Sequence, residues 1–197
     1  MTSEFVHLHN HSDYSLLDGA QRVDQLVDTI DDLNMDSLAL TEHGNMFSVV
    51  PFYNQAKNTG IKPIIGCETY VAVGSRHNKK PPAGGGWGNN HLILLVQNQS
   101  GYQNLMKLVT AGYLEGFYYR PRIDMELLEK YNEGLICLSG CLKGEIPEKM
   151  LTGDYQGAKN AALKFSEIFP DRYYLEVQNH GISEEEANIE NMKKLSK

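Results

Sequence analysis

The stretch KPIIGCETYVAV, residues 62–73, combines a continuous apolar run with a carboxylate in the middle. Its segment PIIG resembles two later runs, LILLV and LICL, and such runs are typical of strands buried on both faces of a parallel sheet. A carboxylate inside such a strand is rarely buried without a partner. The stretch therefore predicts a buried strand in which Glu68 has a partner.

Further short β-rich runs alternate with helical patterns on both sides of this stretch. Strands are also predicted at 4–10, 37–41, 91–98, 134–139 and 172–178. Helices are predicted at 23–33, 47–58, 101–113, 124–131, 144–151, 154–169 and 183–197. The first helix is the clearest, because its apolar residues follow i, i+3, i+4, i+7 spacing. Repeated βα units of this length predict an α/β barrel or a doubly wound sheet.

The loop at 74–90 and the last helix bear on how the chain is divided into domains. Residues 74–90, GSRHNKKPPAGGGWGNN, are rich in glycine and proline and predict a mobile surface loop. No internal repeat or linker is evident, so we expect one domain over 1–197. The last helix reaches Lys197 without a capping signal or a following strand, which indicates a piece of a longer protein.

Composition narrows the class of protein. The 197 residues are 41% hydrophobic and 22% charged, as in a globular domain with a full core. No apolar run approaches the roughly 20 residues of a membrane span, and the N-terminus lacks a signal-peptide pattern, so we expect a cytoplasmic protein. Cys67, Cys137 and Cys141 form no CxxC pair, which disfavours a disulfide framework. The net charge of −7 means that a phosphate substrate would need bound cations to neutralise it.

Histidines are concentrated near the N-terminus, in FVHLHNHSDYSLLDGA, residues 5–20. His7, His9 and His11 alternate, so on an extended strand they would project from one face. A buried imidazole needs a partner for each ring nitrogen. A shared metal ion is the partner that this cluster favours.

Other potential ligands follow predicted strands. His43 follows SLALTE and Cys141 follows GLICLSG, at the carboxyl ends where functional side chains gather in α/β folds. His91 opens its strand instead, and would need a distorted barrel or a reversed strand. Each has an ordinary reading alone: a turn residue, a strand cap, or a small buried hydrophobe. Together, imidazole, carboxylate and thiolate are the donors of a metal-ligand set, and a carboxylate can bridge two ions.

Five stretches together closely resemble the polymerase and histidinol phosphatase (PHP) domain family. They are HNHSDYSLLDGA, LTEHGNMF, PFYNQAKNTGIKPIIGCETYVA, YLEGFYYRPRID and LSGCLKGEIP. More narrowly, they resemble the branch of the family at the N-terminus of bacterial replicative DNA polymerase III alpha subunits. The resemblance covers essentially the whole chain. It implies a distorted (β/α)7 TIM-like barrel, here truncated at its C-terminal end.

The resemblance also implies a metal centre with up to three divalent ions. Its ligands in this chain would be His9, His11, Asp18, His43, Glu68, His91 and Cys141. One ion would be held by the first two histidines and Glu68, a second by Glu68, His91 and Cys141, and a third by Asp18 and His43. His7 falls outside this set. Zinc suits the mixed ligands best, with manganese or iron as alternatives.

Two further ligands of the family pattern, in an Asp-x-His motif, should follow the 183–197 helix. This chain contains no such motif after that helix. We therefore expect the chain to hold its metals less tightly and less completely than an intact domain.

The implied activity is metal-assisted phosphoester hydrolysis, in which bound ions activate water and stabilise developing charge. Glu68, His9, His11 and His91 would be the catalytic residues. With a DNA 3′ end as substrate, the activity would be a 3′–5′ proofreading exonuclease. Arg120 and Arg122 would contact phosphate or form surface ion pairs. Nucleotide polymerisation would reside in later domains of the parent DNA polymerase.

Two other functions stay open. The domain would be a non-catalytic, metal-stabilised platform that packs on polymerase domains or docks a separate subunit. Alternatively, it would be a stand-alone phosphomonoesterase of the histidinol-phosphatase type. The expected partners are the DNA 3′ end and the other polymerase III holoenzyme subunits, with no membrane and with this chain as a monomer.

Overall fold

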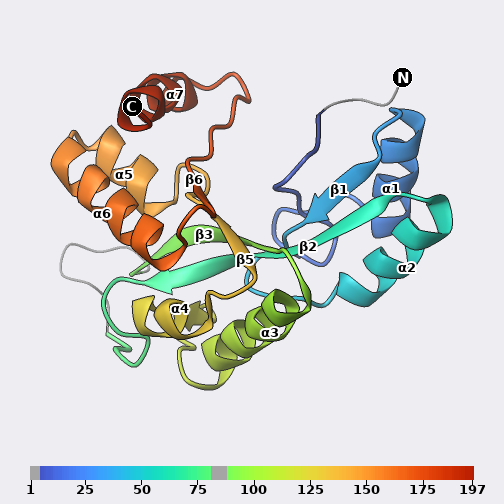
Figure 1. Ribbon diagram of the computed structural model, residues 1–197, viewed down its shortest axis with the longest axis horizontal. Coiled ribbons are helices and arrows are strands. Elements are labelled where there is room, and N and C mark those ends of the chain that lie inside the picture. Colours follow the sequence, from blue (N-terminus) through green and yellow to red (C-terminus); the bar gives the residue numbers. More distant parts are fainter. Residues whose placement is uncertain (1–4, 81–87) are drawn as a thin grey trace.

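The long strand β2 (Lys62–Ala72) lies at the centre of a mixed sheet in the computed structural model, which describes residues 5–80 and 88–197 (Figure 1). The other strands in these ranges are β1 (Ser37–Leu40), β3 (Asn89–Val96), β4 (Arg122–Ile123), β5 (Leu135–Leu138) and β6 (Tyr173–Tyr174). Their order is β1-β2-β3-β5-β6, and β4 pairs with β2 beside this path. The α/β class is therefore as predicted, while β1 and β6 end the described path without closing a barrel.

Strand direction departs from the expected parallel sheet. β2 runs parallel to β1 and to β4, and β6 runs parallel to β5. β3 runs antiparallel to both β2 and β5, so the prediction of parallel strands was wrong for LILLV. The reversal places His91, at the start of β3, opposite Tyr70 near the carboxyl end of β2. A reversed strand was one of the two conditions under which His91 could join the site.

The helices occupy the predicted places. They are α1 (Val23–Asp32), α2 (Val49–Thr59), α3 (Gln99–Leu114), α4 (Met125–Tyr131), α5 (Glu145–Leu151), α6 (Tyr155–Ile168) and α7 (Ser183–Leu195). The side chains of Asn98, Asp124 and Asp154 accept hydrogen bonds from the first turns of α3, α4 and α6. These caps satisfy backbone donors that have no partner within the helix. They explain why the three helices begin where they do.

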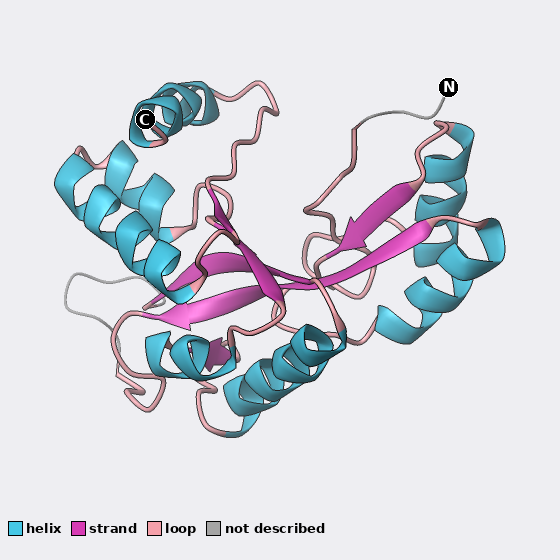
Figure 2. Ribbon diagram, viewed as in Figure 1, coloured by secondary structure: helices cyan, strands magenta, loops and turns pink. Residues whose placement is uncertain are grey.

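The helices bury their apolar faces in separate clusters. The largest core joins β2, β3 and β5 to α3, α4, α5 and α6, while α1 and α2 pack with β1 around Val27, Leu38 and Phe52. In the view of Figure 2, α1 and α2 lie at the right-hand end of the sheet, α3 and α4 below it, and α5 and α6 at its left. A third, smaller cluster contains Ala39, Ile93, Leu95 and Leu138. Because strand side chains alternate between faces, Glu68 and its neighbour Ile93 share the face of this small cluster.

The N-terminal segment differs from its prediction. Residues 1–4 lie outside the described residues, and residues 5–10 form no strand and bend at His9. The segment instead runs beside β1, where the amides of Ala39 and Thr41 donate to the carbonyls of His7 and Asn10, both at 2.9 Å. These bonds bring the following residues to the carboxyl end of β1, where the histidines meet the sheet.

Three other predictions concern the loop at 74–90, the last strand and the absence of a membrane span. In the predicted loop 74–90, residues 81–87 lie outside the described residues. The predicted strand 172–178 pairs only through Tyr173 and Tyr174. A membrane-spanning helix is not found within the described parts of the chain, where every helix is too short or too polar.

Candidate metal centre

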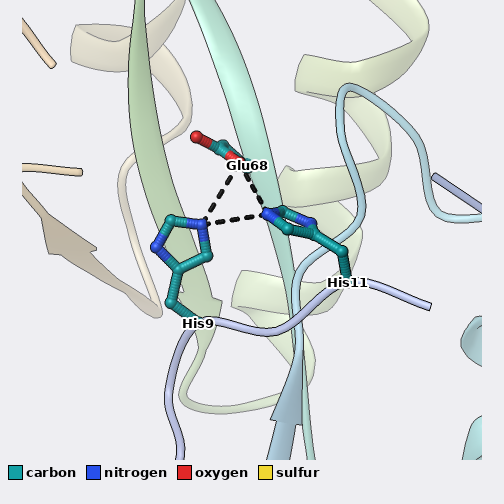
Figure 3. Close-up of side chains that lie close together, drawn as sticks. All are labelled: His9, His11 and Glu68. Carbon is teal, nitrogen blue, oxygen red and sulfur yellow. Dashed lines mark hydrogen bonds and ion pairs between the residues drawn. The ribbon is translucent and has the colours of Figure 1, made fainter. Parts of the chain in front are cut away.

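The carboxylate of Glu68 lies at the centre of the site, on β2, with 1% of its surface exposed. Its Oε2 lies 3.2 Å from Nε2 of His9 and 3.0 Å from Nε2 of His11. The same oxygen lies 3.0 Å from Nδ1 of His43, while Oε1 lies 2.6 Å from Nδ1 of His91. Figure 3 shows how His9 and His11, from the N-terminal segment, point toward Glu68. One buried carboxylate thus faces four imidazoles.

The turn after β1 positions His43. His43 and Glu68 form a parallel bridge, and the amide of Gly44 donates to the Glu68 carbonyl at 2.8 Å. Gly44 has φ of +63°, and a Cβ there would lie 2.8 Å from the Tyr70 ring. Only glycine adopts this conformation and this close approach without strain. The glycine that follows His43 therefore lets the imidazole turn back over β2.

The remaining two predicted ligands lie at opposite sides of this centre. The Cys141 thiol, just after β5, lies 3.9 Å from Oε1 of Glu68 and 4.0 Å from Nδ1 of His91. Oδ2 of Asp18 lies 2.7 Å from Nε2 of His43. The structure therefore brings all seven predicted ligands into one cluster. His7 lies outside it, with its ring edge-on to Phe5 at 4.9 Å.

The donor atoms fall into three overlapping groups. They are His9 with His11 and Glu68, His11 with Asp18 and His43, and His43 with Glu68 and His91. Within each group the ligand atoms lie within 4.8 Å of one another. The first group is the set predicted for the first ion. The other two groups differ from the predicted sets: His11 is grouped with Asp18 and His43, and His43 is grouped with Glu68 and His91.

The electrostatics of the cluster favour positive charge. Burial alone would raise the pKa of Glu68, but hydrogen bonds from the surrounding imidazoles hold it well below its usual value. Burial likewise opposes protonation of His9, yet hydrogen bonds to Glu176 and Glu68 raise its pKa to about 10. The pKa of Cys141 rises to about 12 because of burial and the nearby Glu68. The site therefore binds protons unless another cation replaces them.

Sequence reasoning missed Glu176, which lies just after β6. Its Oε1 accepts a hydrogen bond from Nδ1 of His9 at 2.6 Å, and its amide donates to the Ser139 hydroxyl at 2.8 Å. Metal-binding histidines commonly donate their second ring nitrogen to a carboxylate in this way. The only signal in the sequence is a charged residue within the predicted strand RYYLEVQ.

Sequence reasoning also missed Glu42, which precedes His43 and is 1% exposed. It accepts hydrogen bonds from the hydroxyls of Ser12 and Ser15, and from that of Ser48 at 2.9 Å. The Ser15 oxygen in turn accepts from the amide of His43 at 3.0 Å. Glu42 therefore anchors the loop that carries Asp18, and the acidic residue beside a candidate ligand in LTEHGN is its only sequence signal.

The two arginines that were expected at phosphate have different surroundings. Arg122 is 2% exposed and donates to the main-chain carbonyls of Gly116, Arg76 and Asn78. Because these bonds occupy its guanidinium inside the protein, Arg122 has a structural role and does not face a substrate. Arg120 is half-buried, with its guanidinium carbon 5.3 Å from the centre of the Tyr70 ring. Since Tyr70 borders His91 at 5.1 Å, Arg120 lies beside the centre.

The residues fit divalent metal ions. Nδ1 of His11 and Oε2 of Glu176 are buried and have no hydrogen-bond partner among the described residues. Buried polar atoms are normally paired, so orphaned atoms within a histidine and carboxylate cluster indicate a missing partner. Imidazole, carboxylate and thiolate donors together suit zinc and related ions.

Comparison with known proteins assigns the family. The PHP domain family matches residues 7–180. The chain is 50% identical over 195 residues to DNA polymerase III subunit alpha of Borreliella burgdorferi, covering 99% of this chain and 17% of that protein. It is 43% identical over 196 residues to the Thermus aquaticus subunit, covering 98% and 16%. Since the family match spans most of its length, the chain belongs to the PHP domain family.

The matches also show how much of each relative this chain corresponds to. It spans about a sixth of the length of the curated relatives that it matches. Among solved structures, an amidohydrolase from Chromobacterium violaceum overlaps with a TM-score of 0.39 at 19% identity. That overlap covers 82% of this chain and 39% of the other, and it is too loose to define the fold further.

Proposed function

We propose that this centre is a metal-dependent phosphoesterase site, and that in a longer DNA polymerase it acts as a 3′–5′ proofreading exonuclease. The observation that carries the proposal is the buried Glu68 carboxylate, which faces four imidazoles within 3.2 Å. A carboxylate with two oxygens can bridge two cations, as two-metal phosphoesterase chemistry requires. The DNA polymerase III relatives support a DNA end as the substrate.

Each residue has a separate task in this proposal. When bound, divalent ions lower the pKa of water and stabilise the charge that develops on the phosphoester oxygens. Up to three ions, zinc or otherwise manganese or iron, would be held by His9, His11, Asp18, His43, Glu68, His91 and Cys141. Glu176 orients His9, and Arg120 donates to a substrate phosphate from beside Tyr70.

The proposal also includes a closed barrel in the longer protein. A cavity of about 740 Å³ lies between residues 5–9 and 174–180, over Ile64, Leu95 and Ile136. It separates the N-terminal segment beside β1 from the region of β6, the two ends of the described sheet path. One or two further βα units would fill this space and complete a distorted (β/α)7 barrel. They would supply the aspartate and histidine of the family pattern, so that 1–197 is an incomplete PHP domain.

A single-turnover assay on a 5′-labelled single-stranded oligodeoxynucleotide tests the activity. With zinc or manganese added, we expect shortening from the 3′ end by this chain and by the matched control Glu167→Gln, at an exposed position of α6. Glu68→Gln should abolish the shortening because the bridging carboxylate is lost. Turnover of p-nitrophenyl phosphate without any attack on the oligonucleotide would contradict the exonuclease and favour a phosphomonoesterase.

A metal-stabilised platform is a second candidate, and one structural observation favours it. Residues 5–18 contain neither helix nor strand, yet His9, His11 and Asp18 tie this segment to the sheet through Glu68 and His43. Bound metal would therefore fasten the N-terminal segment whether or not hydrolysis follows. Such a platform would pack on polymerase domains or on other holoenzyme subunits. Stabilisation by metal, with no hydrolysis of any phosphoester, would favour this function.

A further inference from the structure

A row of exposed aromatic rings has no role in the site described so far. Phe47 is 66% exposed, Tyr113 38% and Phe117 48%. The ring centres of Phe47 and Tyr113 are 6.4 Å apart, and those of Tyr113 and Phe117 are 6.2 Å apart with planes at 26°. Single exposed apolar residues are ordinary, but several aromatic rings in one contiguous group indicate a binding surface. We call these three residues the aromatic row.

The aromatic row is anchored to the metal centre through the turn after β1. Phe47 follows His43 by four positions, and the Asn45 side chain joins them. Its amide donates to the His43 carbonyl at 3.1 Å, and its oxygen accepts from the Phe47 amide at 3.0 Å. Tyr113 lies near the end of α3 and Phe117 just beyond it. The aromatic row therefore begins four residues after the candidate metal ligand His43, in the same turn after β1.

Tyr70 and Arg120 connect the same region to the centre from the sheet. The Tyr70 ring lies 5.1 Å from that of His91 and 6.1 Å from that of His43. The Arg120 side chain lies over Tyr70 and donates to its hydroxyl at 3.4 Å. Pro121, the next residue, packs against the turn at Gly44. A cationic donor for phosphate thus lies close to both the imidazoles and the turn that leads to the row.

We propose that the aromatic row is a stacking platform for the unpaired bases of a single-stranded nucleic acid whose terminal phosphodiester enters the metal centre. The inference rests on the proposed phosphoesterase function and names its substrate class. Every base has a π-face, so stacking on aromatic rings binds single strands with little sequence preference. Paired bases within a duplex do not expose these faces, so the row selects a frayed or mispaired end.

The charge of the chain supports stacking as the main source of affinity. With a net charge of −7, the chain has no overall positive charge that would attract a phosphate backbone. Stacking does not require neutralisation of many phosphates, so its affinity depends only weakly on salt. A partner protein would be the other occupant of such a surface, but a row that leads from aromatic rings to a phosphoesterase centre matches a base beside a phosphate.

The test is equilibrium binding of this chain to a single-stranded dT ten-mer with 2-aminopurine as its 3′-terminal base. Stacking quenches the fluorescence of this base, so binding is measured without any hydrolysis. Phe47→Leu and Tyr113→Leu keep an apolar side chain but remove the ring, and each should weaken binding about tenfold. Tyr155→Leu replaces a tyrosine on α6 that is 45% exposed, between the values for Tyr113 and Phe47; it is the matched control and should bind as the unchanged chain does.

Each result supports or overturns the inference. Quenching that weakens in the two row variants but not in Tyr155→Leu, with a shallow salt dependence, supports it. Absence of quenching, or equal weakening in the control, overturns it. So would a dimer in sedimentation that Phe47→Leu dissociates while no oligonucleotide binds, because the row would then be a protein interface. Hydrolysis of bis(p-nitrophenyl) phosphate by the metal-loaded chain tests the phosphoesterase separately, so a failure of the stacking platform can be distinguished from a failure of the phosphoesterase.

Discussion

Glu176 and Glu68 contact opposite nitrogens of the same imidazole. Nδ1 of His9 lies 2.6 Å from Glu176, and Nε2 lies 3.2 Å from Glu68. A carboxylate on one nitrogen fixes the ring orientation and the tautomer, which leaves the other nitrogen directed at the centre. Glu176 is therefore a positioning residue for His9, even though it lies outside the predicted ligand set.

Replacing Glu176 by glutamine should weaken metal binding by about 10- to 100-fold while the chain stays folded. The amide keeps the size of the side chain but loses the charge that orients His9. Competition with a chromogenic chelator measures the affinity, and Glu167→Gln, at an exposed position of α6, is the matched control. Equal affinities in the two variants would show that Glu176 does not orient the ligand.

Replacing Glu42 by glutamine should lower the free energy of unfolding by about 1–3 kcal/mol. The buried carboxylate accepts from three serine hydroxyls, and an amide nitrogen cannot accept in their place. Urea denaturation measures the change, with exposed Glu133→Gln as the control. Because the loop with Asp18 loses its anchor, metal content should fall as well. Unchanged stability together with full metal content would rule out this anchoring role.

Removal of metal should lower the thermal midpoint. A ligand present at about 100 times its dissociation constant stabilises the folded state by about 2.7 kcal/mol. For a chain of this size, that corresponds to a shift of about 5–10 °C. Calorimetry with EDTA, and again after zinc is restored, measures the effect. A midpoint that does not respond to either treatment would mean that no metal contributes to the fold.

In the presence of chelator, stability should fall as the pH rises from about 6.5 toward 10. The pKa of His9 is about 10 in the folded chain against 6.5 in the unfolded chain, so the folded state holds the extra proton in this range. The raised pKa of His43 acts in the same direction. Glu68 has the opposite sign, because its lowered pKa stabilises the fold above about 4.5 and that contribution is lost in acid. Urea midpoints at pH 6, 8 and 10 measure the slope, and a midpoint that rises with pH would contradict it.

Elemental analysis should find two or three ions in a chain extended by about 80 residues, the length of one or two further βα units, and fewer in this chain. The extension would add the two ligands of the family pattern and close the cavity beside β6. The two forms, purified in the same metal-replete buffer, provide the comparison. No metal in either form would mean that the histidines have a structural role only.

The sequence predicted the elements better than their directions. The spacing of Val23, Leu26, Val27 and Ile30 predicted α1, and the structure buries all four. The run LILLV predicted β3 equally well, but a continuous apolar run is compatible with either direction. Its antiparallel pairing depends on the partner strands β2 and β5, which composition does not encode.

The same distinction holds for the site. The seven predicted ligands lie in recognisable family motifs, and the structure brings them into one cluster centred on Glu68. Glu42 and Glu176 were missed because their roles arise from contacts between segments distant in sequence. Arg122 was expected at a phosphate, yet main-chain carbonyls from residues 76, 78 and 116 surround it. Local polarity does not reveal such burial.

The contact between His9 and Glu176 spans 167 positions, and this separation imposes an order in time. During synthesis His9 emerges first, and the carboxylate that orients it emerges only 167 residues later. Contacts that close so large a loop form late in folding, after local helices and neighbouring strands. Until Glu176 has been synthesised, His9 therefore lacks the carboxylate that orients it, and the metal centre is completed only after the helices and strands between these two residues have formed.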